Sequence, residues 1–258
     1  MKILLTGYKG FIGSHLLNSL ADHEVVTFEW GEQLPTVDES YDWILHIGAN
    51  SSTTERDVDK IMSQNYDFSV DLFEQAKQHG VNFQYSSSAS VYGLNKEFSE
   101  TSPADPKSPY AWTKYLFDRY TQKHPGKIIT QGFRYFNVYG PAGESHKGSQ
   151  ASPFYQFTKQ AKETGVIKLF ENSENYLRDF VPVETVVDTH LRFFDVKESG
   201  VWNVGTGEPT SFDDVARKIA GQYGARIEII PMPEALKNQY QAYTCADMTK
   251  LRATLNAK

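Results

Sequence analysis

Short apolar runs alternate with amphipathic segments along the first two thirds of the chain. The runs predict strands, and the segments between them have the periodicity of helices that cross from one strand to the next. This alternation predicts an α/β fold with a doubly wound parallel sheet. The expected strands are Ile3–Leu5, Val25–Glu29, Trp43–Ile47, Phe83–Ser86, Ile128–Phe133 and Val201–Val204, and the expected helices are Phe11–Asp22, Val58–His79, Pro109–Lys123, Phe154–Thr164, Phe212–Tyr223 and Asp247–Thr254.

One connection of this sheet is unusually short. Only the twelve residues 30–41 separate Glu29 from Asp42, where a doubly wound sheet usually has a helix, an edge strand and a second helix. Twelve residues are too few for all three elements. Fully extended, at roughly 3.3 Å per residue, they reach about 40 Å, which is enough to cross the first strand. We therefore expect a sheet with a trimmed edge.

The alternating pattern loosens into loops with Gly and Ser after residue 140. It returns to a strand-like "RDFVPV" and ends in mixed segments rich in Tyr and Pro. We expect a main domain from residues 1–140, to which 182–206 return, and a small α+β lobe that binds the substrate, formed by 141–181 and 207–258.

The composition is that of an ordinary globular protein. The chain has 258 residues, 40% of them hydrophobic and 22% charged, which is enough for one substantial core. A net charge of -6 argues against nucleic-acid binding, because a phosphate backbone attracts a basic surface. The single cysteine, Cys245, excludes an internal disulfide and a cysteine-built zinc site. No signal peptide or membrane span is visible, so we expect a cytoplasmic protein without a metal or a membrane partner.

The segment "ILLTGYKGFIG" places Gly7, Gly10 and Gly13 between an apolar strand and a helix. Glycines there let backbone N–H groups approach a pyrophosphate at the helix N-terminus, although tight packing without a ligand would give the same pattern. Glu29 ends the second strand, where a carboxylate either accepts both hydroxyls of an adenosine ribose or is simply solvated. No Lys or Arg lies between Glu29 and Arg56 to bind a 2′-phosphate. We therefore expect NAD(P), with NAD favoured over NADP.

Tyr110 and Lys114 lie four residues apart on a helix whose start is marked by Ser108 and Pro109, so they share one face. The preceding "QYSSSASVYG" predicts a strand that opens into serines at the C-terminal edge of the sheet, where such folds bind ligands. A phenol must ionise to accept an alcohol proton, and an ammonium about 4 Å away supplies roughly the 4 kcal/mol that this requires. The group suits hydride transfer between a carbinol and a nicotinamide.

These motifs resemble those of a known family. Gly7, Gly10, Gly13, Ser88 and Tyr110-xxx-Lys114 are together similar to the extended short-chain dehydrogenase/reductase superfamily, whose members mostly oxidise, epimerise or dehydrate nucleotide sugars. Within it, "SSTTE", "FRYFNVYGP", "HKGSQAS", "LFENSENYLRDFV" and "YQAYTCADMTKLRA" resemble the ADP-glycero-manno-heptose 6-epimerase family. The resemblance implies a Rossmann domain and an isomerase acting on a nucleoside-diphosphate sugar. A 4-epimerase, a dehydratase, a reductase and a regulator that only binds the cofactor remain alternatives.

The resemblance also implies the catalytic residues Ser88, Tyr110, Lys114 and Lys147. A 6-epimerase oxidises a carbinol to a ketone and returns hydride to its other face, so the intermediate must turn within the site. Tyr110 can serve only one of the two orientations, because proton transfer requires contact at about 3 Å. Lys147 matches the lysine that serves the other in this family, while a solvated loop lysine is the alternative.

The remaining site residues are carried over by matching position. The implied cofactor set is Gly7, Gly10, Phe11, Ile12, Gly13, Glu29, Gly48, Ala49, Asn65, Tyr110, Lys114 and Val138, and the implied substrate set is Ser51, Asn137, Ser149, Gln156, Phe170, Ser173, Arg178 and Tyr240. The guanidinium of Arg178 suits a diphosphate, although pairing with Asp179 or Glu184 is the alternative. Phe170 and Tyr240 fit the core of the lobe equally well.

Three features depart from the family. Gln156 stands where the family has a histidine, the edge strand with its basic residues has no counterpart, and the chain ends soon after "KLRATLNAK". In the superfamily the helices that hold Asn65 and Tyr110 pair across a dimer. We expect a homodimer or higher homo-oligomer through these helices, whose apolar side chains include Phe68, Leu72, Phe73, Tyr115 and Phe117.

Overall fold

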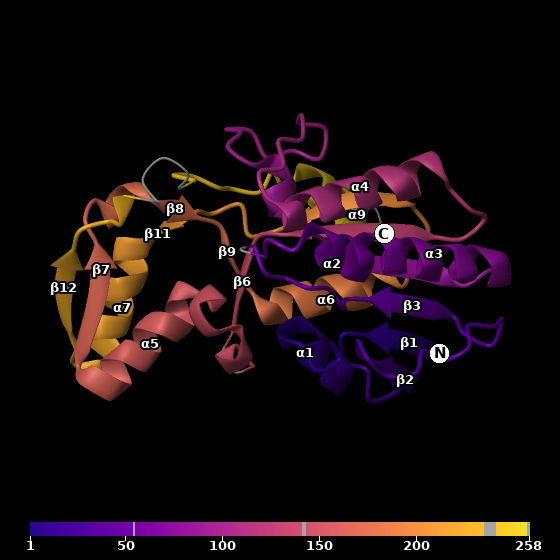
Figure 1. The fold of residues 1–258 in the computed structure, drawn as a ribbon, viewed down its shortest axis with the longest axis horizontal. Helices are drawn as coiled ribbons and strands as arrows, with labels where there is room; N and C mark the ends of the chain where they lie inside the picture. Colours follow the sequence, from indigo (N-terminus) through magenta and orange to yellow (C-terminus); the bar gives the residue numbers. More distant parts are fainter. Residues whose placement is uncertain (54, 141–142, 235–240, 257–258) are drawn as a thin grey trace.

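The computed structural model describes residues 1–53, 55–140, 143–234 and 241–256. Its centre is a six-stranded parallel sheet in the order β10-β5-β4-β3-β1-β2, which confirms the expected α/β fold (Figure 1). The strands are β1 (Lys2–Thr6), β2 (Glu24–Phe28), β3 (Trp43–His46), β4 (Asn82–Ser88), β5 (Thr130–Tyr135) and β10 (Gly200–Val204). Helices α1 (Phe11–Ser19) and α6 (Val183–Phe193) cover one face, and α2 (Val58–Met62), α3 (Phe68–His79) and α4 (Pro109–Lys123) cover the other.

Successive side chains of the central strands are buried on opposite faces of the sheet. In β1, Leu4 belongs to the apolar cluster that includes α3 and α4, whereas Ile3 and Leu5 belong to the cluster that includes α1 and α6. All three side chains are fully buried. Burial on both faces explains why these strands are continuous apolar runs in the sequence.

The trimmed edge of the sheet is confirmed. β2 is the outermost strand beside β1, and β3 pairs with the opposite side of β1. The connection 30–41 contains no helix and no strand. Val37 and Tyr41 are buried and pack into the same cluster as Leu4, so this connection closes the end of the core without a helix or strand.

The expected single helix Val58–His79 is wrong in one detail. Its middle is a π-helical turn, η1 (Ser63–Asp67), between α2 and α3. The hydroxyl of Ser69 donates to the carbonyl oxygen of Asn65, which is a side-chain alternative to the regular helical bond. A π turn of this kind often marks a functional site, and this one contains Asn65.

Several boundaries differ from expectation by up to three residues, including those of β4 and of the last helix. β4 extends through all three serines to Ser88, which pairs with Tyr135 of β5. The last helix, α9 (Thr249–Asn256), begins later than expected and packs on β10, where the indole of Trp202 donates to Thr254 at 3.0 Å.

A smaller lobe lies beside the main sheet, at the left of Figure 1. Its apolar core joins two helices to a two-stranded parallel sheet. The division into 1–140 with 182–206 and 141–181 with 207–258 stays a prediction. The lobe and its connections contain β6 (Asn137–Tyr139), η3 (Ser145–Gln150), α5 (Pro153–Thr164), β7 (Val166–Phe170), β8 (Leu177–Arg178), β9 (Phe180–Pro182), β11 (Thr210–Ser211), α7 (Phe212–Tyr223) and β12 (Arg226–Ile230).

Candidate active site

The glycines of the first turn are required by the close approach of β1, β3 and α1. Gly7 has a φ of 74°, and a Cβ there would collide with the backbone of Gly48. A Cβ on Gly13 would collide with the carbonyl oxygen of Gly7. The turn thus holds the N-terminus of α1 directly beside the end of β1, which is the geometry that Rossmann folds use for a pyrophosphate.

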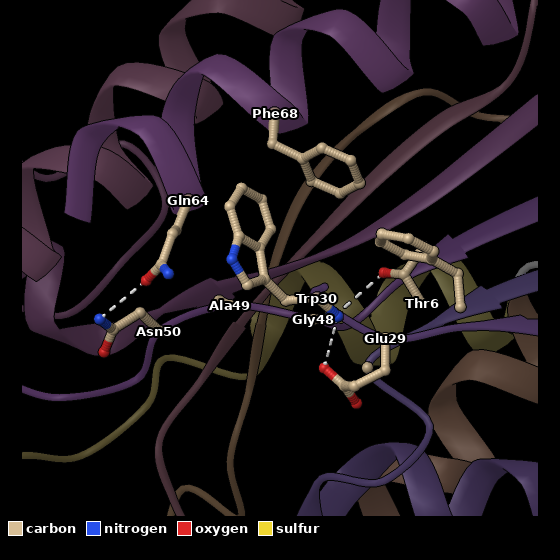
Figure 2. Close-up of a pocket in the computed structure, with 10 residues that line it drawn as sticks. Thr6, Glu29, Trp30, Gly48, Ala49, Asn50, Gln64 and Phe68 are labelled. Atoms are coloured by element: carbon tan, nitrogen blue, oxygen red, sulfur yellow. Dashed lines mark hydrogen bonds between the residues drawn. The ribbon is translucent and has the colours of Figure 1, made fainter. Parts of the chain in front are cut away.

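A first cavity of about 240 Å³ opens where β1, β2 and β3 end. It brings together Gly7, Glu29, Gly48 and Ala49 of the expected cofactor set (Figure 2). Sequence reasoning missed the other lining residues, among which the rings of Trp30 and Phe68 meet edge to face at 5.5 Å. The lining is Thr6, Gly7, Phe28, Glu29, Trp30, Gly48, Ala49, Asn50, Gln64 and Phe68.

The carboxylate of Glu29 is positioned by the backbone of this cavity. It accepts the N–H of Trp30 at 3.1 Å and the N–H of Lys9 at 3.3 Å. Each carboxylate oxygen has further lone pairs, so the group can still accept ribose hydroxyls. A 2′-phosphate would instead meet a negative charge.

A chain of buried hydrogen bonds supports the wall of the first cavity. The N–H of Gly48 donates to Thr6 Oγ1 at 3.2 Å, and this hydroxyl contacts His46 Nδ1 at 2.7 Å. His46 Nε2 contacts Ser69 Oγ at 2.8 Å, and that hydroxyl donates to Asn65. Burial lowers the pKa of His46 to about 3, so the ring is neutral. His46 therefore donates from Nε2 and accepts at Nδ1, and its ring joins β1 and β3 to the π turn.

Asn65 lies behind the wall of this cavity. Its Oδ1 accepts the N–H of Asn50 at 2.7 Å, and its Nδ2 donates to the carbonyl oxygen of Asn50 at 3.0 Å and to Thr113 at 3.3 Å. Its side chain is buried rather than on the helix surface. Asn65 holds Asn50 in the wall and ties this segment to α4.

A second cavity of about 220 Å³ brings together the expected catalytic side chains Ser88, Tyr110 and Lys147. Ile12, Asn137 and Val138 of the expected cofactor and substrate sets also line it. The hydroxyl of Ser87, also in this lining, is buried and has no hydrogen-bond partner among the described residues. The lining is Ile12, Ser87, Ser88, Tyr110, Tyr135, Phe136, Asn137, Val138, Lys147, Gln150, Ser152 and Pro153.

The surroundings of Tyr110 differ from the expectation that a nearby ammonium favours ionisation of its phenol. Lys114 Nζ lies 6.0 Å from the centre of the Tyr110 ring and donates to the carbonyl oxygen of Ser86 at 2.8 Å. Burial lowers the pKa of Lys114 to about 8, against an opposing effect of Asp118. Burial raises the pKa of Tyr110, and its hydrogen bond with Ser88 opposes that rise. In this geometry the neighbour that favours the phenolate is therefore Ser88.

Lys147 lies on a short 3-10 helix, η3, rather than on an irregular loop. Its Nζ is 4.2 Å from the centre of the Phe11 ring and 3.8 Å from Glu144 Oε2. Glu144 is completely buried and accepts the N–H and hydroxyl of Ser152 at 2.6 and 2.7 Å. Burial lowers the pKa of Lys147, while Glu144 opposes this effect. Sequence reasoning missed Glu144, which anchors both ends of the Lys147 segment.

Tyr135 lines the second cavity, and the buried His190 lies behind it. Gln84 Nε2 donates to Gln131 at 3.0 Å, so its oxygen accepts from His190 Nδ1 at 2.7 Å. Burial lowers the pKa of His190 to about 3, which leaves its Nε2 to accept the hydroxyl of Tyr135 at 2.6 Å. The phenol oxygen of Tyr135 remains an acceptor toward the cavity.

Several expected substrate residues lie outside both cavities. Ser173 and Arg178 are buried in the lobe, and the guanidinium of Arg178 lies 5.5 Å from the centre of the Phe212 ring. The amide of Gln156 donates to the carbonyl oxygen of Gly148. Ser51 is exposed and Phe170 is half-buried. The side chain of Ser149 and the whole of Tyr240 lie outside the described residues, and the roles of this set stay predictions.

In 1–53, 55–140, 143–234 and 241–256, no helix is long and apolar enough to cross a membrane. The same residues contain no group of three or more His, Cys, Asp or Glu side chains placed to hold a metal ion.

The fold and the two cavities define a Rossmann-type α/β protein with a Ser–Tyr–Lys group at the C-terminal edge of its sheet. The profile of the NAD dependent epimerase/dehydratase family matches residues 3–205, and the chain belongs to this family. One relative is the ADP-L-glycero-D-manno-heptose-6-epimerase of Alkalilimnicola ehrlichii. It is 36% identical over an alignment of 290 positions, gaps included, which covers 97% of this chain and 90% of the relative.

Solved structures agree with this assignment. The ADP-L-glycero-D-manno-heptose-6-epimerase of Helicobacter pylori superposes with a TM-score of 0.87 at 26% identity, over 99% of this chain and 90% of that one. The UDP-glucose 4-epimerase of Thermotoga maritima, with UDP-glucose, gives 0.86 at 26% identity, over 99% and 93%. The UDP-glucose 4-epimerase of Thermus thermophilus in complex with NAD gives 0.81 at 26% identity, over 98% and 92%.

Proposed function

We propose that this chain is an NAD(P)-dependent nucleotide-sugar epimerase whose substrate is an ADP-glycero-manno-heptose or a close analogue. The observation that carries the proposal is that Ser88, Tyr110 and Lys147 line one cavity. Two acid/base side chains from separate elements, α4 and η3, thus face the same space. The 36% identity with an ADP-heptose 6-epimerase supports the choice of sugar.

The residues of the first cavity fit a nicotinamide dinucleotide. The turn that cannot accept a Cβ at Gly7 or Gly13 would hold the pyrophosphate, and Glu29 would hold the adenosine ribose. Bound there, the dinucleotide would supply a hydride acceptor that later returns the hydride to the sugar. The carboxylate of Glu29 favours NAD over NADP, and one relative is known as a complex with NAD.

Tyr110 and Ser88 would handle the first proton. Ser88 holds the sugar oxygen, while the phenolate of Tyr110 accepts the proton of the hydroxyl as the carbon is oxidised to a ketone. Lys114 is the buried cation nearest to this step, with its ammonium 6.0 Å from the centre of the phenol ring. Its ammonium donates to the carbonyl oxygen of Ser86 instead, so Ser88 is the neighbour that favours the phenolate.

Lys147 would handle the second proton. After the ketone has turned, its oxygen faces η3, and the ammonium of Lys147 donates a proton to it as hydride returns to the opposite face of the carbon. Burial lowers the pKa of Lys147, which makes the amine easier to deprotonate at neutral pH. Glu144 opposes this effect, favours the protonated form of Lys147 and holds its ammonium in place. We place this reaction in the cytoplasm, catalysed by a homodimer.

The proposal is tested by epimerisation of ADP-glycero-manno-heptose, with the two epimers separated by chromatography, and by mass spectrometry of any dinucleotide that copurifies. We expect the wild type to interconvert the epimers and Lys147→Met to lose about 10²- to 10⁴-fold in kcat, the usual contribution of a general acid/base. Lys159→Met removes an exposed lysine of α5 outside both cavities and serves as the matched control.

Two results would contradict this assignment. Normal epimerisation by Lys147→Met, with Tyr110 intact, would eliminate the two-base mechanism and favour a 4-epimerase or reductase. Binding of NAD without turnover of any nucleotide sugar would favour a cofactor-binding regulator.

A further inference from the structure

We infer that Glu32 sets the cofactor preference of the first cavity, because it holds the ammonium of Lys9 in an ion pair and so denies a 2′-phosphate its cation. This inference rests on the proposed binding of a dinucleotide. It assigns the discrimination between NAD and NADP to a pair of residues outside the lining of the cavity.

The pair lies directly beside the carboxylate that would hold the ribose. Lys9 Nζ lies 2.7 Å from Glu32 Oε1, and the backbone N–H of Lys9 donates to Glu29. Lys9 therefore reaches the 29–32 segment from the glycine turn, although no Lys or Arg follows Glu29 in the sequence before Arg56. The charge of this lysine is next to the place where NADP carries its additional phosphate.

Glu32 is fixed in place by its neighbours. Its Oε2 accepts the N–H of Glu29 at 2.8 Å, and its Oε1 accepts the hydroxyl of Tyr8 at 3.3 Å. The N–H of Glu32 in turn donates to the carbonyl oxygen of Glu29 at 3.0 Å. Two donors besides Lys9 therefore position the carboxylate, a backbone bond holds its residue in the turn, and no rearrangement is needed to maintain the pair.

The Lys9–Glu32 ion pair should affect the binding of a ligand more than the free energy of folding. The side chains of Lys9 and Glu32 are 58% and 37% exposed, and exposed ion pairs contribute little to folding. The bond to Glu32 is the main cause that raises the pKa of Lys9, and the bond to Lys9 is the main cause that lowers the pKa of Glu32. With both groups charged, the edge of the first cavity formed by Lys9, Glu29 and Glu32 carries two carboxylates and one ammonium. Its net charge is negative, which opposes the binding of a phosphate dianion.

The experiment measures the dissociation constants of NAD and NADP by titration calorimetry on the full chain. We expect the wild type to prefer NAD, and Glu32→Gln to shift the ratio of the two constants toward NADP by about five- to tenfold, since it frees Lys9 and removes one repelling charge. The double variant Lys9→Gln, Glu32→Gln should lose most of this shift. The shift should also shrink at high salt, because the groups are exposed.

Glu39→Gln is the matched control, since it removes a carboxylate from the same 30–41 connection where the side chain is 87% exposed and contacts His79 instead. It should leave the ratio unchanged, and thermal unfolding should show that each variant is folded. An unchanged ratio in Glu32→Gln, or a shift that persists in the double variant, would overturn the inference alone. Failure of the wild type to bind either dinucleotide would overturn the proposed function as well.

Discussion

His46 and His190 are buried on the two sides of the sheet and each bridges two elements as a neutral ring. His46 joins Thr6 of β1 to Ser69 of α3, and His190 of α6 joins Gln84 of β4 to Tyr135 of β5. A neutral imidazole can donate at one nitrogen and accept at the other, which a protonated ring cannot do. Both cavities therefore depend on histidines that stay unprotonated.

Acidification should destabilise the fold in a window that these histidines define. Their pKa values fall from 6.5 to about 3 on folding, so the unfolded chain binds more protons between these values. The contribution of these two rings to the free energy of unfolding is complete above pH 6.5. It is lost as the pH falls toward 3, by up to about 1.4 kcal/mol per pH unit for each ring. Thermal unfolding between pH 7 and 5 should therefore show a falling Tm.

Variants can separate the pH dependence of stability that is due to the histidines from that due to the carboxylates. His190→Gln should reduce the slope of stability against pH by roughly half, because one of two titrating rings is removed. His124→Gln changes an exposed histidine outside both cavities and is the matched control for the substitution itself. Equal slopes in wild type and His190→Gln would show that His190 is protonated in the folded state.

At the scale of elements, two helical glycines differ in whether a side chain would fit at their position. Gly13 lies in α1 against the carbonyl of Gly7, whereas Gly221 lies in α7 with nothing within 4 Å of an added Cβ. The two positions are both helical, but only the first is constrained by contact with another element.

Alanine at these two glycines should have opposite effects on the free energy of unfolding. Gly13→Ala should destabilise by about 1–3 kcal/mol, because the backbone of the turn must move, and should weaken dinucleotide binding in parallel. Gly221→Ala should stabilise by about 0.5–1 kcal/mol, because alanine favours the helix. Denaturant unfolding checks both, and a stable Gly13→Ala that binds NAD normally would contradict the close approach of α1.

At the scale of the whole molecule, the homodimer remains a prediction, and the structure changes the residues on which it depends. Leu72, Phe73 and Phe117 are buried in the core of their own chain, so they are not available to a partner. Trp112 of α4 and Val58 of α2 are instead 47% and 53% exposed, on the helices expected to pair. An apolar interface there would use these two side chains.

Light scattering should show a dimer that Trp112→Glu converts to monomer, since a charge in the core of an interface has no partner. Ile229→Glu changes a side chain of β12 that is 60% exposed, far along the lobe, and should leave the dimer intact. A monomeric wild type would remove the prediction altogether.

Much of the molecule could be predicted because its signals are local. The apolar runs of β1, β3 and β4, the short 30–41 connection, the three glycines and the Tyr110–Lys114 spacing are all visible within a few residues of sequence. Period, chain length and turn chemistry act over such distances, so the order of elements and the Tyr110–Lys114 pair follow from them. The choice of Ser88 follows instead from the resemblance to the superfamily.

Other features required the tertiary structure, because their partners lie far apart along the chain. Ser69 bonds the carbonyl oxygen of Asn65 in the π turn. Glu144 bonds Ser152 and lies beside Lys147, and Glu32 pairs with Lys9. Trp30 and Phe68 line one cavity because the end of β2 and the start of α3 come together, with the rings of Phe28 and Phe68 stacked at 5.5 Å. The sequence by itself determined which chemistry the chain carries, while only folding decided which charges are buried and which are paired, since desolvation and hydrogen bonding depend on neighbours that no local pattern specifies.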